Sequence, residues 1–302
     1  MEDDARISSM QRTSVIFFGT PLFACPSLER LHASGAFHIP LVVTQPDRPV
    51  GRKQLLTAPP VKILAQRLGL SVCQPSEPSK ELPSLLEALQ IARPDFLVVV
   101  AYGHILRKPL LELPRVAPVN VHASLLPRWR GASPIEHAIM MGDGTTGVTI
   151  QIMVEALDAG PILAQQESPI GEHDTTSMLR ERLSSLGAEL LLHTLLHPLT
   201  PKAQPQEGVT TCMKLRKDDG HADPLTMEAM HIDRLVRALS PWPGVTCPVQ
   251  GKTIKILRAA LAPSALSLPL PCAKGSILYL ETVQEPGRKP LPALEWSRGA
   301  RL

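Results

Sequence analysis

Short apolar runs alternate with longer amphipathic stretches along the first two-thirds of the chain. The runs are rich in Val, Ile or Phe and are bounded by Gly, Pro or polar residues, as is typical of buried strands. They predict strands at residues 15–18, 40–44, 96–100 and 119–122, with helices between them at residues 22–34, 60–68 and 79–92. Alternation at this spacing predicts an α/β fold with a mostly parallel sheet that helices cover on both faces.

The pattern changes after the last of these strands. Two more strands are predicted at residues 148–154 and 162–167, joined through Leu157-Asp158-Ala159-Gly160, and a longer helix at residues 176–197. Residues 198–208 are rich in proline and have no period, which is typical of a linker. Beyond them the pattern predicts one helix and three short strands, at residues 227–239, 245–249, 253–259 and 276–283. These elements favour a small carboxy-terminal β-domain of barrel type.

We therefore expect an α/β domain over residues 1–199, a linker over residues 200–210 and a β-domain over residues 211–302. Charge differs between the two parts. Residues 1–210 carry 18 Lys and Arg against 20 Asp and Glu, whereas residues 211–302 carry 13 against 8. The surplus of +5 after the linker suits either contact with a polyanion or an ordinary solvated face, and composition does not decide between them.

The overall composition excludes several classes of protein. Apolar residues make up 44% of the chain and charged residues 20%, which is typical of a folded globular protein. No apolar run is long enough to span a bilayer, so we expect no membrane partner. The acidic start, Met1-Glu2-Asp3-Asp4, lacks a signal core and favours a bacterial cytoplasmic location. The five cysteines form no CxxC pair, which favours reduced, buried thiols over disulfides or a zinc site.

Asn120, His122 and Asp158 are the candidate catalytic residues. Asn120 and His122 lie two positions apart at the end of a predicted strand, so their side chains share one face of the sheet. The carboxyl ends of strands are where ligands bind in open α/β sheets. An Asn amide and an imidazolium can stabilise an oxyanion, and Asp158, in the turn after the next strand, can orient the imidazole. This set suits direct acyl transfer without a covalent intermediate.

Simpler interpretations of these residues remain open at this level. A single His at the end of a strand is often only a structural hydrogen-bond donor or acceptor. Ser124 with His122 as its base is a second alternative, although no G-x-S-x-G elbow surrounds the serine. A metal site at His122 and Asp158 lacks a third ligand in the sequence, so we expect no metal.

Several longer motifs carry a resemblance to a known family. They are Phe18-Gly-Thr-Pro-Leu-Phe-Ala24, Asn120-Val-His-Ala-Ser-Leu-Leu-Pro127 with its continuation Arg128-Trp-Arg-Gly-Ala-Ser-Pro-Ile135, Leu157-Asp-Ala-Gly-Pro-Ile-Leu163, Lys214-Leu-Arg-Lys217 and Ser240-Pro-Trp-Pro243. With them, nearly the whole chain resembles the 10-formyltetrahydrofolate-dependent formyltransferases. Among these it resembles the branch that acts on methionyl-tRNA.

The resemblance implies a fold and a reaction. The fold is a Rossmann-like, mostly parallel sheet (the formyltransferase fold) followed by a small β-barrel of the OB type. The reaction transfers the formyl group of 10-formyltetrahydrofolate to the α-amine of methionine on initiator methionyl-tRNA. Asn120, His122 and Asp158 match the family's catalytic residues, and no metal is implied. We expect the enzyme to act as a monomer.

The resemblance also implies where the two substrates bind. It places tetrahydrofolate against two segments, Ser124-Leu125-Leu126-Pro127 and Tyr102-Gly103-His104-Ile105-Leu106. The loop over residues 47–57 inserts toward the acceptor end of the tRNA in the family. Arg48, Arg52 and Lys53 in this loop are therefore the candidate tRNA contacts, since cationic side chains bind phosphates.

Two departures from the family pattern and two competing functions qualify this interpretation. The loop carries Gln54 and Leu55 where many relatives have more basic residues. The tail from Gly275 is short by about one hairpin, which leaves the closure of the barrel open and predicts an exposed sheet edge. The competing functions are formyl transfer to another amine, on glycinamide ribonucleotide or an amino sugar, and RNA binding without catalysis. Neither requires all of the catalytic triad, the basic loop and the basic second domain together.

Overall fold

A computed structural model describes residues 12–51, 53–76, 87, 89 and 93–299. Two compact units make up the chain. The first comprises residues 1–130, 147–167 and 181–209, and the second comprises residues 131–146, 168–180 and 210–302. The chain thus passes between the units several times, and the expected boundaries at residues 199 and 211 stay a prediction.

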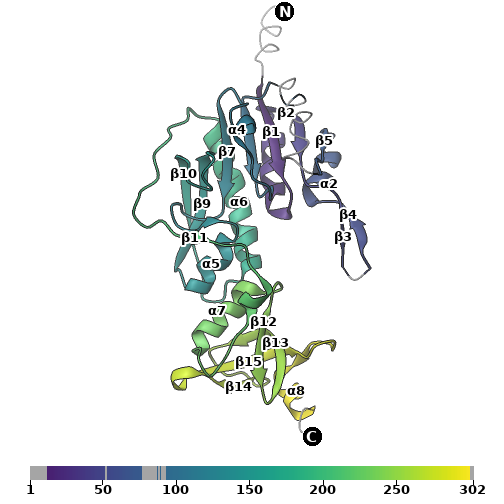
Figure 1. Cartoon of the computed structure of the whole chain (residues 1–302), viewed down its shortest axis with the longest axis vertical. Coiled ribbons are helices and arrows are strands. Elements are labelled where there is room, and N and C mark those ends of the chain that lie inside the picture. Colours follow the sequence, from purple (N-terminus) through teal and green to yellow (C-terminus); the bar gives the residue numbers. More distant parts are fainter. Residues whose placement is uncertain (1–11, 52, 77–86, 88, 90–92, 300–302) are drawn as a thin grey trace, which may run out of the picture. The chain divides into compact units, whose positions relative to one another are not determined.

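The first unit is built on a seven-stranded sheet in the order β10-β9-β7-β6-β1-β2-β5 (Figure 1). Its strands are β1 (Thr13–Gly19), β2 (Phe37–Val43), β5 (Val72–Cys73), β6 (Phe96–Val100), β7 (Ala117–His122), β9 (Thr145–Ile152) and β10 (Ile162–Pro169). Five of them, from β7 to β5, are joined by parallel pairings, and β9 runs antiparallel to β7. The prediction of a mostly parallel α/β sheet is confirmed.

The strand order predicts which edge of this sheet holds a ligand site, here called the site edge. The order reverses between β1, which continues to β2, and β6, which lies on its other side. In open α/β sheets such a reversal opens a crevice at the carboxyl ends of the strands. β7 pairs next to β6 in parallel, so His122 at its end belongs to the same edge.

Helices pack on this sheet through apolar side chains. They are α1 (Cys25–Ala33), preceded by the short helix η2 (Leu22–Ala24), then α2 (Pro60–Arg67), α4 (Lys108–Leu111) and α6 (Thr176–Leu195). A Cβ at Gly187 of α6 would lie 3.0 Å from Val121 and 3.3 Å from Val148, so the helix approaches β7 and β9 closely there. Successive side chains of a strand point to opposite faces, so Val121 faces α6 whereas Asn120 and His122 point away from it. Helix α6 therefore covers the sheet face opposite these two polar residues.

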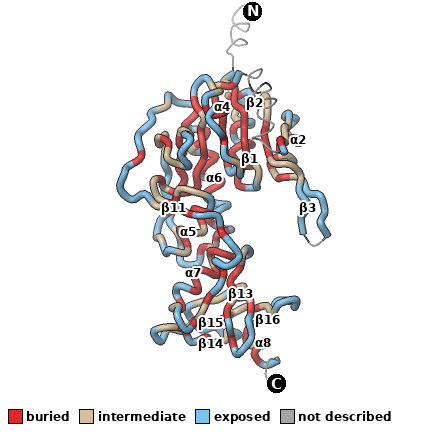
Figure 2. The backbone as a smooth tube through the Cα atoms, viewed as in Figure 1, coloured by how far each residue is buried: buried red, intermediate tan, exposed pale blue. Residues whose placement is uncertain are grey.

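One apolar cluster supports the ends of the central strands. It contains Ile16, Phe18, Val43, Leu89, Leu97, Val99, Tyr102, Leu106, Leu110 and Leu111. In Figure 2 the central strands are buried along their length. The helix predicted at residues 79–92 lies largely outside the described residues.

The segment expected to be a loop over residues 47–57 forms a hairpin instead. β3 (Arg48–Val50) pairs antiparallel with β4 (Leu55–Thr57), in the register Arg48–Thr57 and Val50–Leu55. Every described residue from Arg48 to Thr57 is exposed (Figure 2). The base is fixed by Asp47, which accepts hydrogen bonds of 2.8 Å from Lys62 and from Gln74.

The second unit contains an antiparallel sheet and three α-helices. The sheet has the order β12-β13-β15-β14, with β16 also paired to β15. Its elements are α5 (Pro134–Met141), β11 (Thr211–Cys212, paired with β8, Arg130–Gly131), η3 (Lys217–Gly220), α7 (Ala229–Leu239), β12 (Val245–Val249), β13 (Lys252–Ala260), β14 (Leu268–Pro271), η4 (Ala273–Gly275), β15 (Ile277–Gln284), β16 (Leu291–Pro292) and α8 (Ala293–Gly299). The predicted helix and three strands are all present.

Several elements of this unit were not predicted, and helix α5 and strand β14 show why. Helix α5 begins with Pro134 at its first turn and ends at Gly142, whose φ of 73° is left-handed. Both are ordinary start and stop signals that the pattern analysis overlooked. Strand β14 contains Pro269 and Pro271, which disguise a strand because proline cannot donate to a ladder. It lies at the end of the strand order, where prolines protect an edge from further pairing.

None of the helices within the described ranges is long and apolar enough to cross a membrane. The expectation that all cysteines are buried holds for Cys212, Cys247 and Cys272 but is wrong for Cys25 and Cys73, which are partly exposed. Burial raises the pKa of the Cys247 thiol to about 12, with Cys272 and Asp223 contributing.

This pKa predicts that Cys247 is unreactive in the folded protein. At pH 8 a thiol with this pKa is ionised in roughly one molecule in ten thousand, against about a quarter for an unfolded cysteine. We expect iodoacetamide to alkylate Cys247 at least ~100-fold more slowly in native protein than in urea, measured by peptide mass spectrometry. Equal rates would show that β12 does not bury the thiol.

Candidate active site

The paired strands β7 and β9 carry four polar side chains on one face. Asn120 lies opposite Gln151, and His122 lies opposite Thr149. Residues directly opposite one another in a ladder point to the same side of the sheet. All four are at least 90% buried, so this polar face is enclosed in the protein and needs internal hydrogen-bond partners.

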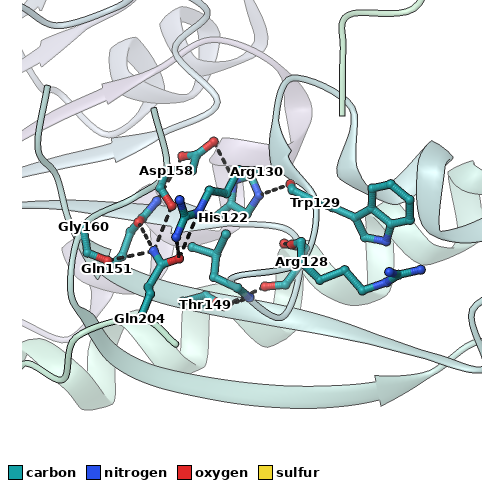
Figure 3. Close-up of polar contacts among 11 residues, drawn as sticks. His122, Arg128, Trp129, Arg130, Thr149, Gln151, Asp158, Gly160 and Gln204 are labelled. Atoms are coloured by element: carbon teal, nitrogen blue, oxygen red, sulfur yellow. Dashed lines mark hydrogen bonds and ion pairs between the residues drawn. The ribbon is translucent and has the colours of Figure 1, made fainter. Parts of the chain in front are cut away.

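Both ring nitrogens of His122 face acceptors (Figure 3). Nε2 lies 2.9 Å from the carbonyl oxygen of Trp129, and Nδ1 lies 3.6 Å from Oδ2 of Asp158. A carbonyl oxygen and a carboxylate both accept hydrogen bonds, so each ring nitrogen has an acceptor beside it. The sequence-based prediction that Asp158 returns to the imidazole is met by this geometry.

Asp158 is held at its carboxylate and at its backbone. Gln151 donates from Nε2 to Oδ1 at 3.0 Å, which leaves Oδ2 facing His122. The backbone φ of Asp158 is +50°, in the left-handed region that few residues other than Gly, Asn and Asp adopt readily. A short polar side chain at this turn therefore satisfies the backbone as well as the site.

Asn120 differs from its neighbours because its side-chain amide makes no hydrogen bond to another described residue. It is 9% exposed and lies near the end of β7, beside Val99 of β6. A nearly buried amide with an unused N–H is suited to a ligand carbonyl oxygen.

The segment Ser124–Pro127 is fixed by two residues that pattern analysis did not single out. Thr149 donates from Oγ1 to the carbonyl of Ser124 at 2.6 Å and accepts from the N–H of Leu126 at 3.1 Å. Gln165 donates to the carbonyl of Leu126 at 2.9 Å. The Ser124 hydroxyl donates to the carbonyl of Arg128 at 2.6 Å, so it is bonded away from His122 and does not form a nucleophile–base pair with it.

The segment Tyr102–Leu106 follows β6 at the same sheet edge. Tyr102 and Leu106 point into the apolar cluster, whereas Ile105 is 78% exposed. The carbonyl of Tyr102 accepts 2.9 Å hydrogen bonds from Thr20 after β1 and from Gln45 after β2. These contacts tie together three neighbouring strand ends. Gly103 and His104 lie between the anchored residues, and the backbone there takes a φ of +86° at Gly103.

The three candidate tRNA contacts belong to the hairpin of β3 and β4. Arg48 and Lys53 are exposed, and Arg52 lies outside the described residues. Three apolar side chains of the hairpin are also largely exposed, namely Val50, Leu55 and Leu56 at 56%, 64% and 71%. A hairpin with exposed cationic and apolar groups presents a surface for a partner molecule.

Within the described parts of the chain, no group of three or more His, Cys, Asp or Glu side chains is placed to hold a metal ion. The three candidate catalytic groups are the amide of Asn120, the imidazole of His122 and the carboxylate of Asp158. Together they can donate to a developing oxyanion and move a proton.

Known families match both parts of the chain. Residues 11–195 match the family model described as formyl transferase, and residues 214–301 match the model described as formyl transferase, C-terminal domain. The fold, the site edge and these two matches define the class of protein as a formyltransferase with a second, antiparallel domain.

Individual relatives show to which family within this class the chain belongs. The chain is 42% identical over 304 residues to the methionyl-tRNA formyltransferase of Roseiflexus castenholzii, covering 95% of this chain and 96% of that protein. It is 46% identical over 249 residues to the methionyl-tRNA formyltransferase of Halorhodospira halophila, covering 81% and 79%. The chain belongs to the methionyl-tRNA formyltransferase family.

Two solved structures share the fold. The N-formyltransferase of Helicobacter canadensis, solved with folinic acid and dTDP-3-aminofucose, superposes with a TM-score of 0.67 at 17% identity, covering 89% of this chain and 99% of that one. HypX of Aquifex aeolicus, solved with tetrahydrofolic acid, gives 0.61 at 16% identity, covering 93% and 46%. At these identities the similarity shows the fold alone.

Gly160, two residues after Asp158, tests how tightly the turn is packed. A Cβ at this position would collide with the backbone carbonyl oxygen of Ile152, which cannot rotate away. We expect Gly160→Ala to lower the free energy of unfolding by about 3 kcal/mol and to lower kcat by displacing Asp158. Gly144→Ala is the matched control because its Cβ meets nothing within 4 Å, and chemical denaturation of both variants gives the measurement. Equal stabilities would show that the turn is loosely packed.

Proposed function

We propose that the chain transfers the formyl group of 10-formyltetrahydrofolate to the α-amine of methionine on initiator methionyl-tRNA. Membership of the formyltransferase family supports the reaction, and the printed names of the relatives support the acceptor. The observation that carries the proposal is the cluster of the buried Asn120 and His122 at the edge of the sheet with the carboxylate of Asp158, whose side chain is 11% exposed. The relatives named above are bacterial, which supports a bacterial cytoplasmic location.

Asn120 and His122 act on the carbonyl oxygen of the formyl group. The amine attacks the formyl carbon, a new C–N bond forms and the oxygen becomes an oxyanion. The amide N–H of Asn120 and the Nε2–H of His122 donate to that oxygen, and Nε2 exchanges the Trp129 carbonyl oxygen, 2.9 Å away, for the formyl oxygen. The C–N10 bond then breaks, the acceptor amine loses a proton and N10 of tetrahydrofolate gains one. Donors preorganised in a site that excludes water stabilise such an oxyanion more than water does.

Asp158 orients His122 for this step. Its carboxylate lies 3.6 Å from Nδ1 and is itself fixed by Gln151. A carboxylate at this distance sets the orientation of the ring and stabilises positive charge on it while it donates to the oxyanion. Neither role requires a bond between the protein and the formyl group.

The folate is proposed to bind between Ser124–Pro127 and Tyr102–Leu106. Both segments follow strands of the same sheet edge, and both are held by hydrogen bonds from neighbouring strands. Exposed backbone groups beside apolar side chains are the usual lining of a site for a flat heterocycle. Leu125, Pro127, His104 and Ile105 retain exposed surface for such contacts.

Substitution of the catalytic residues tests the mechanism. We expect His122→Ala and Asp158→Asn each to lower single-turnover formylation by about 100-fold or more, because each removes charge stabilisation from the transition state. Asn tolerates the left-handed backbone at position 158, so the fold should survive, as thermal melting will show. The product is formyl-methionyl-tRNA from 10-formyltetrahydrofolate and charged initiator tRNA. Near-normal rates in either variant would contradict the assigned roles.

The hairpin of β3 and β4 is the proposed contact with the tRNA. Its exposed cations suit phosphates, and each such contact releases counterions on binding. We expect the double variant Arg48→Gln/Lys53→Gln to raise KM for tRNA several-fold and to reduce the slope of log K against log salt by about 1–2. Lys108→Gln removes an exposed charge from α4 and serves as the control. An unchanged salt slope in the double variant would argue against the contact.

A further inference from the structure

Gln204 is a buried polar residue in a segment that otherwise faces solvent. It lies in the proline-rich stretch between α6 and β11, where Lys202, Ala203, Pro205 and Gln206 are exposed. Its own exposure is 7%. Burying one amide from an irregular segment is costly unless every polar atom gains a partner.

The Gln204 amide uses all of its hydrogen-bonding capacity (Figure 3). Nε2 donates to the carbonyl oxygens of Asp158 and Gly160, each at 2.8 Å. Oε1 accepts from Nε and from a terminal nitrogen of Arg130, at 3.1 and 2.7 Å. Two donors and two lone pairs are thereby satisfied, and the bonds from a guanidinium are of the stronger, charge-assisted kind.

These bonds hold the backbone at, and just after, the residue that carries the catalytic carboxylate. Gln204 binds the carbonyl of Asp158, whose backbone is left-handed, and the carbonyl of Gly160 two residues further on. Gln151 fixes the carboxylate through the 3.0 Å bond to Oδ1, and its own Oε1 accepts a longer hydrogen bond of 3.4 Å from Nε2 of Gln204. Gln204 therefore sets where the turn lies, and Gln151 sets how the carboxylate points.

The segment that supplies Gln204 is itself anchored nearby. The N–H of Ile162 donates to the carbonyl of Lys202 at 2.8 Å, and the N–H of Lys202 donates back at the same distance. This pair of bonds fixes Lys202, which lies two residues before Gln204, to Ile162 at the start of β10. The register of the segment and the position of the amide are thus determined together.

From this geometry we propose that Gln204 is a positioning residue for catalysis, which acts through Asp158. The connecting segment is then part of the active-site frame, in addition to joining two parts of the chain. Arg130, in the motif that follows Asn120-Val-His, is the residue that orients the amide. The inference rests on the proposed function, because it requires Asp158 to act in formyl transfer.

Gln204→Met tests the role, since it retains volume and removes both donors. We expect kcat to fall by about 10- to 100-fold, the range that a displacement of a catalytic group near 1 Å produces. KM for the folate should change less than about twofold, because the amide bonds only to the protein in this site. Gln206→Met is the matched control, with the same substitution at an exposed glutamine two residues away, and it should leave kcat unchanged.

A double-mutant cycle separates positioning from general stability. If Gln204 acts through Asp158, adding Gln204→Met to Asp158→Asn should lower kcat by less than about twofold. A loss of the same factor in both backgrounds, or a wild-type kcat in Gln204→Met, would overturn the inference. Should Gln204→Met fail to fold, Gln204→Glu carries the same cycle, since it keeps the shape and the Arg130 contact but loses the two donors.

The outcomes also distinguish this inference from the proposed function. A wild-type protein that makes no formyl-methionyl-tRNA overturns the proposed function and the inference with it. An Asp158→Asn variant with wild-type kcat leaves formyl transfer standing but overturns the role of Asp158, and with it the inference. A strong defect in Asp158→Asn with an additive or absent effect of Gln204→Met overturns the inference alone.

Discussion

The antiparallel pairing of β9 with β7 brings Gln151 opposite Asn120 and Thr149 opposite His122, on the sheet face away from α6. Two of these residues are the candidates for chemistry, and the other two fix what surrounds them. Thr149 holds the Ser124–Pro127 segment, and Gln151 holds the carboxylate of Asp158. A slip of one residue in this register would turn all the side chains of β9 to the other face and remove both supports.

Burial strengthens the electrostatic interaction between the candidate catalytic residues. The side chains of His122 and Asp158 are only 7% and 11% exposed, so their interaction is weakly screened by water and salt. The same burial makes an unpaired polar group costly, and the Gln204 amide and the Arg130 guanidinium are correspondingly engaged with one another. Support for the turn at Asp158 thus comes from three separate parts of the chain, at Arg130, Gln151 and Gln204.

Much of the fold was predictable because its signals are local. Apolar runs located the central strands, with β6 and β12 correct at both ends. Helix α5 was predictable from Pro134 and Gly142 but was overlooked, whereas β14 was hidden by its prolines, which only an edge position tolerates. The hairpin at residues 48–57 is exposed on both strands and so has no apolar alternation to reveal it.

The candidate site, like the fold, was predictable from the sequence only in part. The sequence by itself determined that Asn120 and His122 share a face, since residues two apart in a strand must do so, and its motifs identified the family. Only the tertiary structure decided that Asp158 lies 3.6 Å from His122, that Ser124 bonds away from it, and that Gln204 supports the turn. The contacts of Asp158 with His122 and Gln204 join residues 36 and 46 positions apart, and no local period encodes which distant chain segment an isolated polar side chain will meet.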